Sequence, residues 1–118
     1  MKTIINQNQK GFLFKNGKFI KVLNSGKYYT FGDKKIEVVP LSAIIKSAFC
    51  SSEQLRQNEK FREMTETITV GANEKALHFC DDKFVSPLNS GKYDYWKDGH
   101  THNFIKINLT NPEIDENV

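Results

Sequence analysis

The chain has 118 residues, with 17 Lys and Arg, 14 Asp and Glu, and a formal net charge of +3. Hydrophobic residues make up 38% and charged residues 26%, which is typical of one globular domain and argues against a disordered chain. No segment has the roughly 18 consecutive apolar residues of a membrane-spanning helix. Two cysteines are too few for a disulfide framework. Residues 1–10 lack the apolar stretch of a signal peptide, so we expect a cytoplasmic chain.

An internal duplication organises the chain. The six residues Leu23 to Tyr28 recur unchanged at Leu88 to Tyr93, an offset of 65. At this offset, residues 10–28 and 75–93 share ten identities over 19 positions, which indicates a repeat. Each repeat is too short to bury a core alone. We therefore predict a single domain, residues 1–110, in which repeats 2–39 and 67–109 are joined by a partly helical insert, 40–66, and followed by an acidic tail, 111–118.

The first repeat has the pattern of short strands separated by turns. Asn16-Gly17 is a strong hairpin signal, because both positions of such a turn adopt positive φ. Gly26 marks a second turn, and Pro40 ends the last strand. The predicted strands are Gly11–Phe14, Phe19–Leu23, Lys27–Phe31 and Lys35–Val39.

The insert combines an ambiguous segment with a helix. Ile44, Ile45 and Phe49 lie at helical spacings, but the run is short and β-branched, so residues 43–49 are left open between helix and strand. A helix is predicted from Ser52 to Met64, with Ser52 as its N-cap. Residues 65–70 then have strand character.

The second repeat follows the same plan, with predicted strands Ala76–Phe79, Phe84–Leu88, Lys92–Trp96 and Asn103–Leu109. Its first turn, Cys80-Asp81-Asp82, has no glycine, so either the turn is looser or Asp82 takes the left-handed position. The fold class is therefore mostly β with a small α insert. We expect the two antiparallel units to pack about a pseudo-twofold, as a sandwich or a partly open barrel.

Strand alternation selects a core. Eight apolar positions that align between the repeats are predicted to be buried: Phe12, Phe14, Phe19, Leu23, Leu77, Phe79, Phe84 and Leu88. Leu13, His78, Lys21 and Ser86 are expected to face solvent or a second layer, and Ile20 and Val22 to cover a second apolar surface.

The repeated motif resembles a segment of bacterial slipins, which belong to the stomatin–prohibitin–flotillin group. The segment runs here from Lys10-Gly11-Phe12-Leu13-Phe14 to Leu23-Asn24-Ser25-Gly26-Lys27-Tyr28. The resemblance implies a duplicated N-terminal region that acts in scaffolding at a membrane, with no catalytic residue to carry over. The oligomerising domain of that family has no counterpart in these 118 residues. The resemblance therefore implies an N-terminal fragment or a stand-alone relative.

Candidate chemistry is sparse. Asp98, His100 and His102 could hold a metal with His78 and Cys80, but two solvated histidines in a polar loop are the favoured interpretation. Neither cysteine has a thiolate-promoting neighbour, and Ser25 and Ser90 lack the surroundings of a nucleophile. We therefore predict no enzyme, no cofactor and no metal.

Two kinds of surface residue suggest binding. Residues 1–47 carry nine Lys and two acids, against eight basic and twelve acidic residues in 48–118. Aromatic residues follow the shared turn in both repeats. The predicted interaction surface comprises Tyr29, Tyr95, Trp96, Lys18, Lys21, Lys34 and Lys35.

The expected function is a non-enzymatic protein-interaction or scaffold module that contacts a protein partner or itself, with a peripheral location at the inner face of the membrane. The alternative is binding of an anionic surface through the lysines. A lipid surface is favoured over nucleic acid because the first repeat has no Arg. A small metal-dependent enzyme built around His100 and His102 is a distant third possibility.

Overall fold

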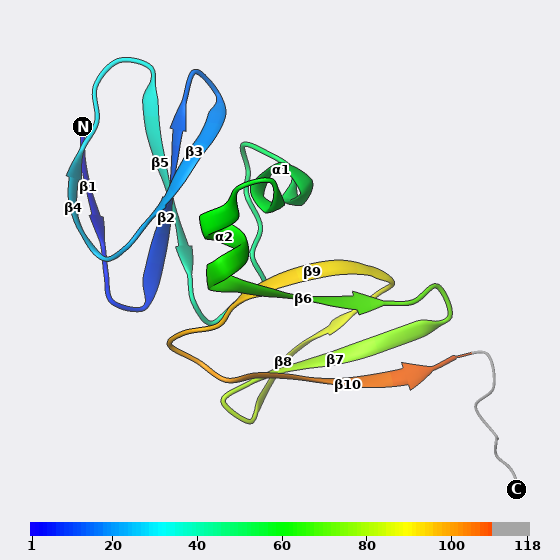
Figure 1. The fold of residues 1–118 in the computed structure, drawn as a ribbon. Coiled ribbons are helices and arrows are strands. Elements are labelled where there is room, and N and C mark those ends of the chain that lie inside the picture. The colour runs from blue at the N-terminus through cyan, green and yellow to red at the C-terminus, as the bar shows by residue number, and fades with distance from the viewer. Residues whose placement is uncertain (110–118) are drawn as a thin grey trace, which may run out of the picture.

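The computed structural model describes residues 1–109 as a mostly β protein with two small helices. Two similar antiparallel halves, β1–β5 and β6–β10, follow one another along the chain, and the helices lie between them (Figure 1). None of the sheets in these residues closes on itself. The predicted fold class is thus confirmed, and the predicted tail, 111–118, lies outside the described residues.

The first half combines a three-stranded sheet with a two-stranded ribbon. The sheet has the order β3-β2-β5, and the ribbon pairs β1 with β4. Gly11 of β2 lies directly over Ile5 of β1, so the ribbon covers one face of the sheet. The strands are β1 Lys2–Ile5, β2 Gln9–Lys15, β3 Lys18–Leu23, β4 Gly26–Tyr29 and β5 Lys34–Pro40; β1 was not predicted.

The second half repeats this plan, with the sheet order β10-β7-β8 and a ribbon of β6 and β9. The β2–β3 hairpin has a register shift between Leu13 and Phe14, and the β7–β8 hairpin has its shift at the equivalent pair, His78 and Phe79. The repeat therefore extends to the details of strand pairing. The strands are β6 Thr65–Val70, β7 Glu74–Cys80, β8 Lys83–Leu88, β9 Gly91–Trp96 and β10 His102–Asn108.

The two hairpin turns use the left-handed conformation with different residues. Asn16 and Gly17 have φ of 53° and 77°, as the Asn-Gly signal predicts. In the second half both Asp81 and Asp82 are left-handed, with φ of 51° and 67°. The turn is therefore as tight as its counterpart, although it has no glycine.

The insert differs from its prediction in two ways. Residues 43–49 form neither helix nor strand. The single helix expected over 52–64 is divided into α1, Ser52–Arg56, and α2, Glu59–Met64. The side chain of Asn58 caps α2 by accepting a hydrogen bond from the Phe61 N–H, and Ser51, one residue before the predicted cap, caps α1. None of the helices in residues 1–109 has the length and apolar character needed to cross a membrane.

The main core lies where the first sheet meets the helices. Phe12 and Phe14 of β2 are buried against Leu55 of α1, Phe61 of α2 and Trp96 of β9. A smaller core inside the second half contains Val70, Ala76 and Leu88. Because β9 contributes to both regions, its ribbon joins the two halves.

The predicted core is partly correct. Phe12, Phe14, Leu23 and Leu88 are buried, whereas Phe19, Leu77 and Phe79 are half-buried. The prediction is wrong for Phe84, which is 55% exposed. His78 faces the second layer and is fully buried, Ile20 is exposed, and Val22 packs against the main core.

Candidate functional site

The sheet β10-β7-β8 has an apolar face that no part of residues 1–109 covers. Leu77 is paired with Pro87 on one side and Ile105 on the other, and Phe79 is paired with Phe84. Side chains at paired positions lie on the same face of a sheet. Phe84, Ile105 and Ile107 are 55%, 54% and 42% exposed. We call this surface the outer face; it comprises Leu77, Phe79, Phe84, Pro87, Ile105 and Ile107.

The equivalent face of the first half is covered. Phe12 and Phe14 occupy the positions of Leu77 and Phe79 in the repeat, and they are 0% and 1% exposed. The insert covers them: Phe61 lies 6.1 Å from Phe12 and Phe49 lies 5.4 Å from Phe14, measured between ring centroids. The two halves thus share a strand plan but differ in what packs on their sheets.

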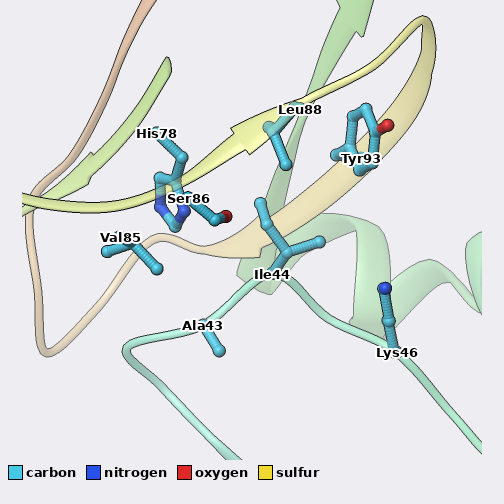
Figure 2. A pocket seen from close by; sticks show the side chains of 8 residues that line it. All are labelled: Ala43, Ile44, Lys46, His78, Val85, Ser86, Leu88 and Tyr93. Atoms are coloured by element: carbon cyan, nitrogen blue, oxygen red, sulfur yellow. The ribbon is translucent and has the colours of Figure 1, made fainter. Parts of the chain in front are cut away.

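The opposite face of the second sheet borders an apolar cleft of about 280 Å³ beneath residues 43–46. Figure 2 shows Ile44 of the insert pointing toward Leu88 of β8, with His78 and Val85 nearby. The His78 Nδ1 atom is buried and makes no hydrogen bond within residues 1–109. The lining of the cleft is mostly apolar, and its polar side chains are Lys46, Ser86, Tyr93 and His78.

A pair of histidines links the second half to the insert. His102 Nε2 lies 3.0 Å from the Leu41 carbonyl oxygen, which can only accept a hydrogen bond. His102 therefore donates from Nε2, and its Nδ1 accepts a hydrogen bond from His78 Nε2 at 2.8 Å. Burial, and next the nearby His102, lower the pKa of His78. The two rings form a structural link between β7, β10 and the insert.

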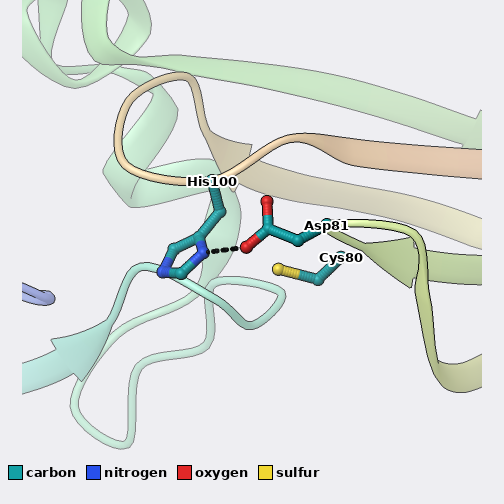
Figure 3. A group of neighbouring side chains, drawn as sticks. All are labelled: Cys80, Asp81 and His100. Carbon is teal, nitrogen blue, oxygen red and sulfur yellow. Dashed lines mark hydrogen bonds and ion pairs between the residues drawn. The ribbon is translucent and has the colours of Figure 1, made fainter.

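A second polar group gathers at the end of β7. Figure 3 shows Cys80, Asp81 and His100 together, with the sulfur pointing to the hydrogen-bonded pair. Asp81 Oδ2 lies 2.6 Å from His100 Nδ1, and the other carboxylate oxygen accepts a hydrogen bond from the Thr101 N–H at 2.9 Å. One ligand atom from each of the three residues lies within 4.8 Å of the others. We call these residues the Cys-Asp-His cluster.

The structure divides the metal ligands that the sequence suggested. His100 and Cys80 come together, while His102 bonds to His78 and Asp98 forms an ion pair with Lys10 at 3.2 Å. Sequence reasoning missed Asp81, whose place at the cluster depends on the left-handed turn. Burial raises the pKa of the Cys80 thiol, and Asp81 raises it further. The pKa of the Asp81 carboxyl is lowered by the Thr101 N–H and then by His100.

The predicted aromatic surface residues lie in different environments. Tyr29 is 63% exposed, as an interaction residue should be. Tyr95 is half-buried, with its ring near His102 and Phe104. Trp96 is fully buried in the main core, and so it is unavailable as a surface contact.

The predicted lysines do not form a single face. Lys21 and Lys34 line a cleft of about 170 Å³ together with Tyr29. Lys35 lies over the ring of Phe49 at 5.3 Å on the other side of the sheet. Lys18 and Lys34 each pair in register with Lys15, so three exposed ammonium groups meet at one end of the first sheet.

The outer face was missed because three of its residues, Leu77, Phe79 and Phe84, were predicted to lie in the core. Its sequence signal is the run Phe104-Ile105-Lys106-Ile107, which places apolar residues on both faces of a strand and is typical of a strand covered on both sides.

Comparison with known proteins adds no assignment: no protein-family model, curated protein or solved structure matches the chain.

Proposed function

We propose that the chain is a non-enzymatic protein-interaction module that binds a second copy of itself through the outer face. The supporting observation is the contrast between the two halves. Phe12 and Phe14 are buried beneath the insert in the first half, whereas their counterparts Leu77 and Phe79 are only half-buried. Phe84, the counterpart of the half-buried Phe19, is exposed. Contiguous exposed apolar surface is typical of protein–protein contact sites.

Charge favours a second copy as the partner. Lys75 is the only charged residue at the outward-facing positions of β7 and β10, and β8 adds Phe84 and Pro87 there. A face that carries so little charge meets no strong repulsion when it packs against itself. Two sheets can pack face to face about 10 Å apart, and symmetric dimers are the commonest assemblies.

Sedimentation equilibrium tests this proposal. The wild-type chain is expected to have twice its monomer mass of 13.6 kDa at micromolar concentration. Ile105→Glu places a charge in the centre of the outer face and should yield the monomer, with an unchanged circular dichroism spectrum. Ile4→Glu is the matched control: Ile4 is also a strand residue, is 53% exposed against 54% for Ile105, and lies in the first half.

Two outcomes would contradict the proposal. One is a wild-type chain that remains monomeric up to about 100 µM, which is weak binding on the usual affinity scale. The other is a dimer that Ile105→Glu leaves intact. The resemblance to slipins supports a setting near a membrane for this contact, and a cytoplasmic location belongs to the same proposal.

A second candidate is binding of an anionic lipid surface by Lys15, Lys18 and Lys34. Like charges on directly paired residues destabilise a sheet, and none of these three lysines forms an ion pair within residues 1–109. An anionic surface would relieve that repulsion. Co-sedimentation should then occur with anionic and not with neutral liposomes, and should decrease as salt rises. Equal binding to neutral liposomes would contradict this candidate.

A further inference from the structure

We propose that the Cys-Asp-His cluster binds a zinc ion, or another first-row divalent ion, which joins the β7–β8 turn to the loop between β9 and β10. This site is separate from the outer face and does not depend on self-association.

The chemistry of the donors selects the ion. A thiolate, an imidazole nitrogen and a carboxylate oxygen are the three ligand types that zinc takes in proteins, at about 2.3, 2.0 and 2.0 Å. Hard cations such as Ca²⁺ and Mg²⁺ prefer oxygen ligands alone, so a site with sulfur and nitrogen disfavours them. Three protein ligands leave a fourth tetrahedral position for water.

The geometry needs only a small change. Ligand atoms around a tetrahedral zinc ion lie roughly 3.3–3.7 Å apart at these bond lengths. The three donors already lie within 4.8 Å of one another, so short side-chain movements would bring them to these spacings. The Asp81–His100 hydrogen bond of 2.6 Å would open to admit the ion. The metal then replaces the proton between these two groups, and the His100 ring carries its proton on Nε2 instead.

The cluster has a donor that no other part of the described chain uses. Cys80 is 8% exposed, and its thiol makes no hydrogen bond within residues 1–109. Its sulfur points toward the Asp81–His100 pair (Figure 3). When the metal binds, the thiol proton leaves to the buffer and the thiolate becomes a ligand.

The carboxylate is held in position from outside the cluster. The Thr101 N–H donates to Asp81 Oδ1, and the Asp81 N–H donates to the Thr101 carbonyl at 2.8 Å. These two bonds leave Oδ2 directed at His100. Hydrogen bonds that orient a ligating carboxylate in this way are typical of metal sites.

The repeat shows that these residues belong to the second half alone. Lys15 and Asn16 occupy the positions of Cys80 and Asp81 in the first half, where an ordinary Asn-Gly turn follows. The loop that carries His100 is also longer. Gly26 and Gly91, which begin β4 and β9, are 65 residues apart, whereas β5 and β10 begin 68 residues apart. The second half thus differs from the first at both segments that supply ligands.

Cobalt titration tests the site, because Co²⁺ takes the place of zinc and a Co²⁺–thiolate bond absorbs in the near ultraviolet. The full chain is treated with EDTA, freed of it and titrated with Co²⁺. We expect the thiolate band to saturate at one equivalent and to disappear when Zn²⁺ is added. Cys50→Ser is the matched control, since it removes the other thiol and should leave the band unchanged.

Two variants make the test specific. Cys80→Ser should abolish the thiolate band, and His100→Ala should weaken Co²⁺ binding at least tenfold. Cys80 is buried, so Cys80→Ser could disturb the fold. His100 is partly exposed, so His100→Ala should leave the fold intact and serves as the second variant. Circular dichroism verifies that each variant is folded. The proposal is overturned if ten equivalents of Co²⁺ produce no band, if the band persists in Cys80→Ser, or if His100→Ala binds as tightly as wild type.

Discussion

Trp96 is the residue that joins the two halves of the molecule. It belongs to β9 of the second half, yet its indole stacks on Phe12 of the first half at 5.8 Å and meets Phe61 of α2 at 5.9 Å. Its side chain is completely buried. The contact therefore stabilises the arrangement of the halves as well as the main core.

Truncation of this side chain is expected to be costly. Trp96→Ala should lower the free energy of unfolding by about 4 kcal/mol, because it removes buried apolar surface and leaves a cavity. Urea denaturation measures the change. Tyr29→Ala serves as the control and should remain within about 0.5 kcal/mol of wild type, since Tyr29 is 63% exposed. A loss below about 1 kcal/mol for Trp96→Ala would contradict the central place of Trp96 in the core.

Gly11 determines how closely two elements, the β1–β4 ribbon and the first sheet, can approach each other. A Cβ atom at this position would lie 2.4 Å from Cδ1 of Ile5 in β1. The equivalent residue of the second half is Ala76, which is buried without such a conflict. The two ribbons therefore pack on their sheets with different side chains at the same position.

Gly11→Ala should destabilise the protein by about 2 kcal/mol, the usual cost of an overpacked core. Ile5→Val removes the atom that the new methyl group would meet. The double variant Gly11→Ala with Ile5→Val should therefore be more stable than the sum of the two single changes predicts, as measured by thermal or urea unfolding. Strict additivity would show that the ribbon does not pack as described.

A metal in the Cys-Asp-His cluster would stabilise the folded state, because it would connect the β7–β8 turn to the β9–β10 loop. A ligand at 100 times its dissociation constant stabilises the folded state by about 2.7 kcal/mol when it does not bind the unfolded chain. We therefore expect Zn²⁺ to raise the melting temperature and EDTA to reverse the increase. Equal melting temperatures with Zn²⁺ and with EDTA, in the wild-type chain, would argue against the site.

The elements were predictable where local sequence determines them. Asn16-Gly17 identifies a hairpin, and the repeated Asn-Ser-Gly segment identifies a turn between strands, because turn geometry depends on a few adjacent residues. The break before α2 was not recognised, since Asn58 can sit inside a helix as well as cap one. Lys2–Ile5 was missed because a four-residue strand has little pattern and depends on its partner β4.

The candidate sites were less predictable because they depend on tertiary packing. Phe84 and Phe19 are equivalent in the repeat, so sequence alone assigned both to the core. Their exposure differs because the insert packs on this face of the first sheet but on the opposite face of the second. Asp81 joins Cys80 and His100 only through the fold of two loops, although the histidine and cysteine were already candidates.

The whole molecule consists of two similar halves with one insert between them (Figure 1). The insert completes the core of the first half through Leu55 and Phe61, and it joins the second half through the Leu41–His102 hydrogen bond. The outer face of the second half remains exposed, because no segment within residues 1–109 packs against it. We propose that a second copy of the chain packs against that face.

The most direct test of this central claim is an isotope-filtered NOE experiment on an equal mixture of ¹³C-labelled and unlabelled chains. Such a spectrum records only contacts between different copies. We predict intermolecular NOEs that involve Leu77, Phe79, Phe84 and Ile105, and none that involve Ile4 or Tyr29. Intermolecular NOEs located in the first half, or a mixture that yields none at millimolar concentration, would contradict the account.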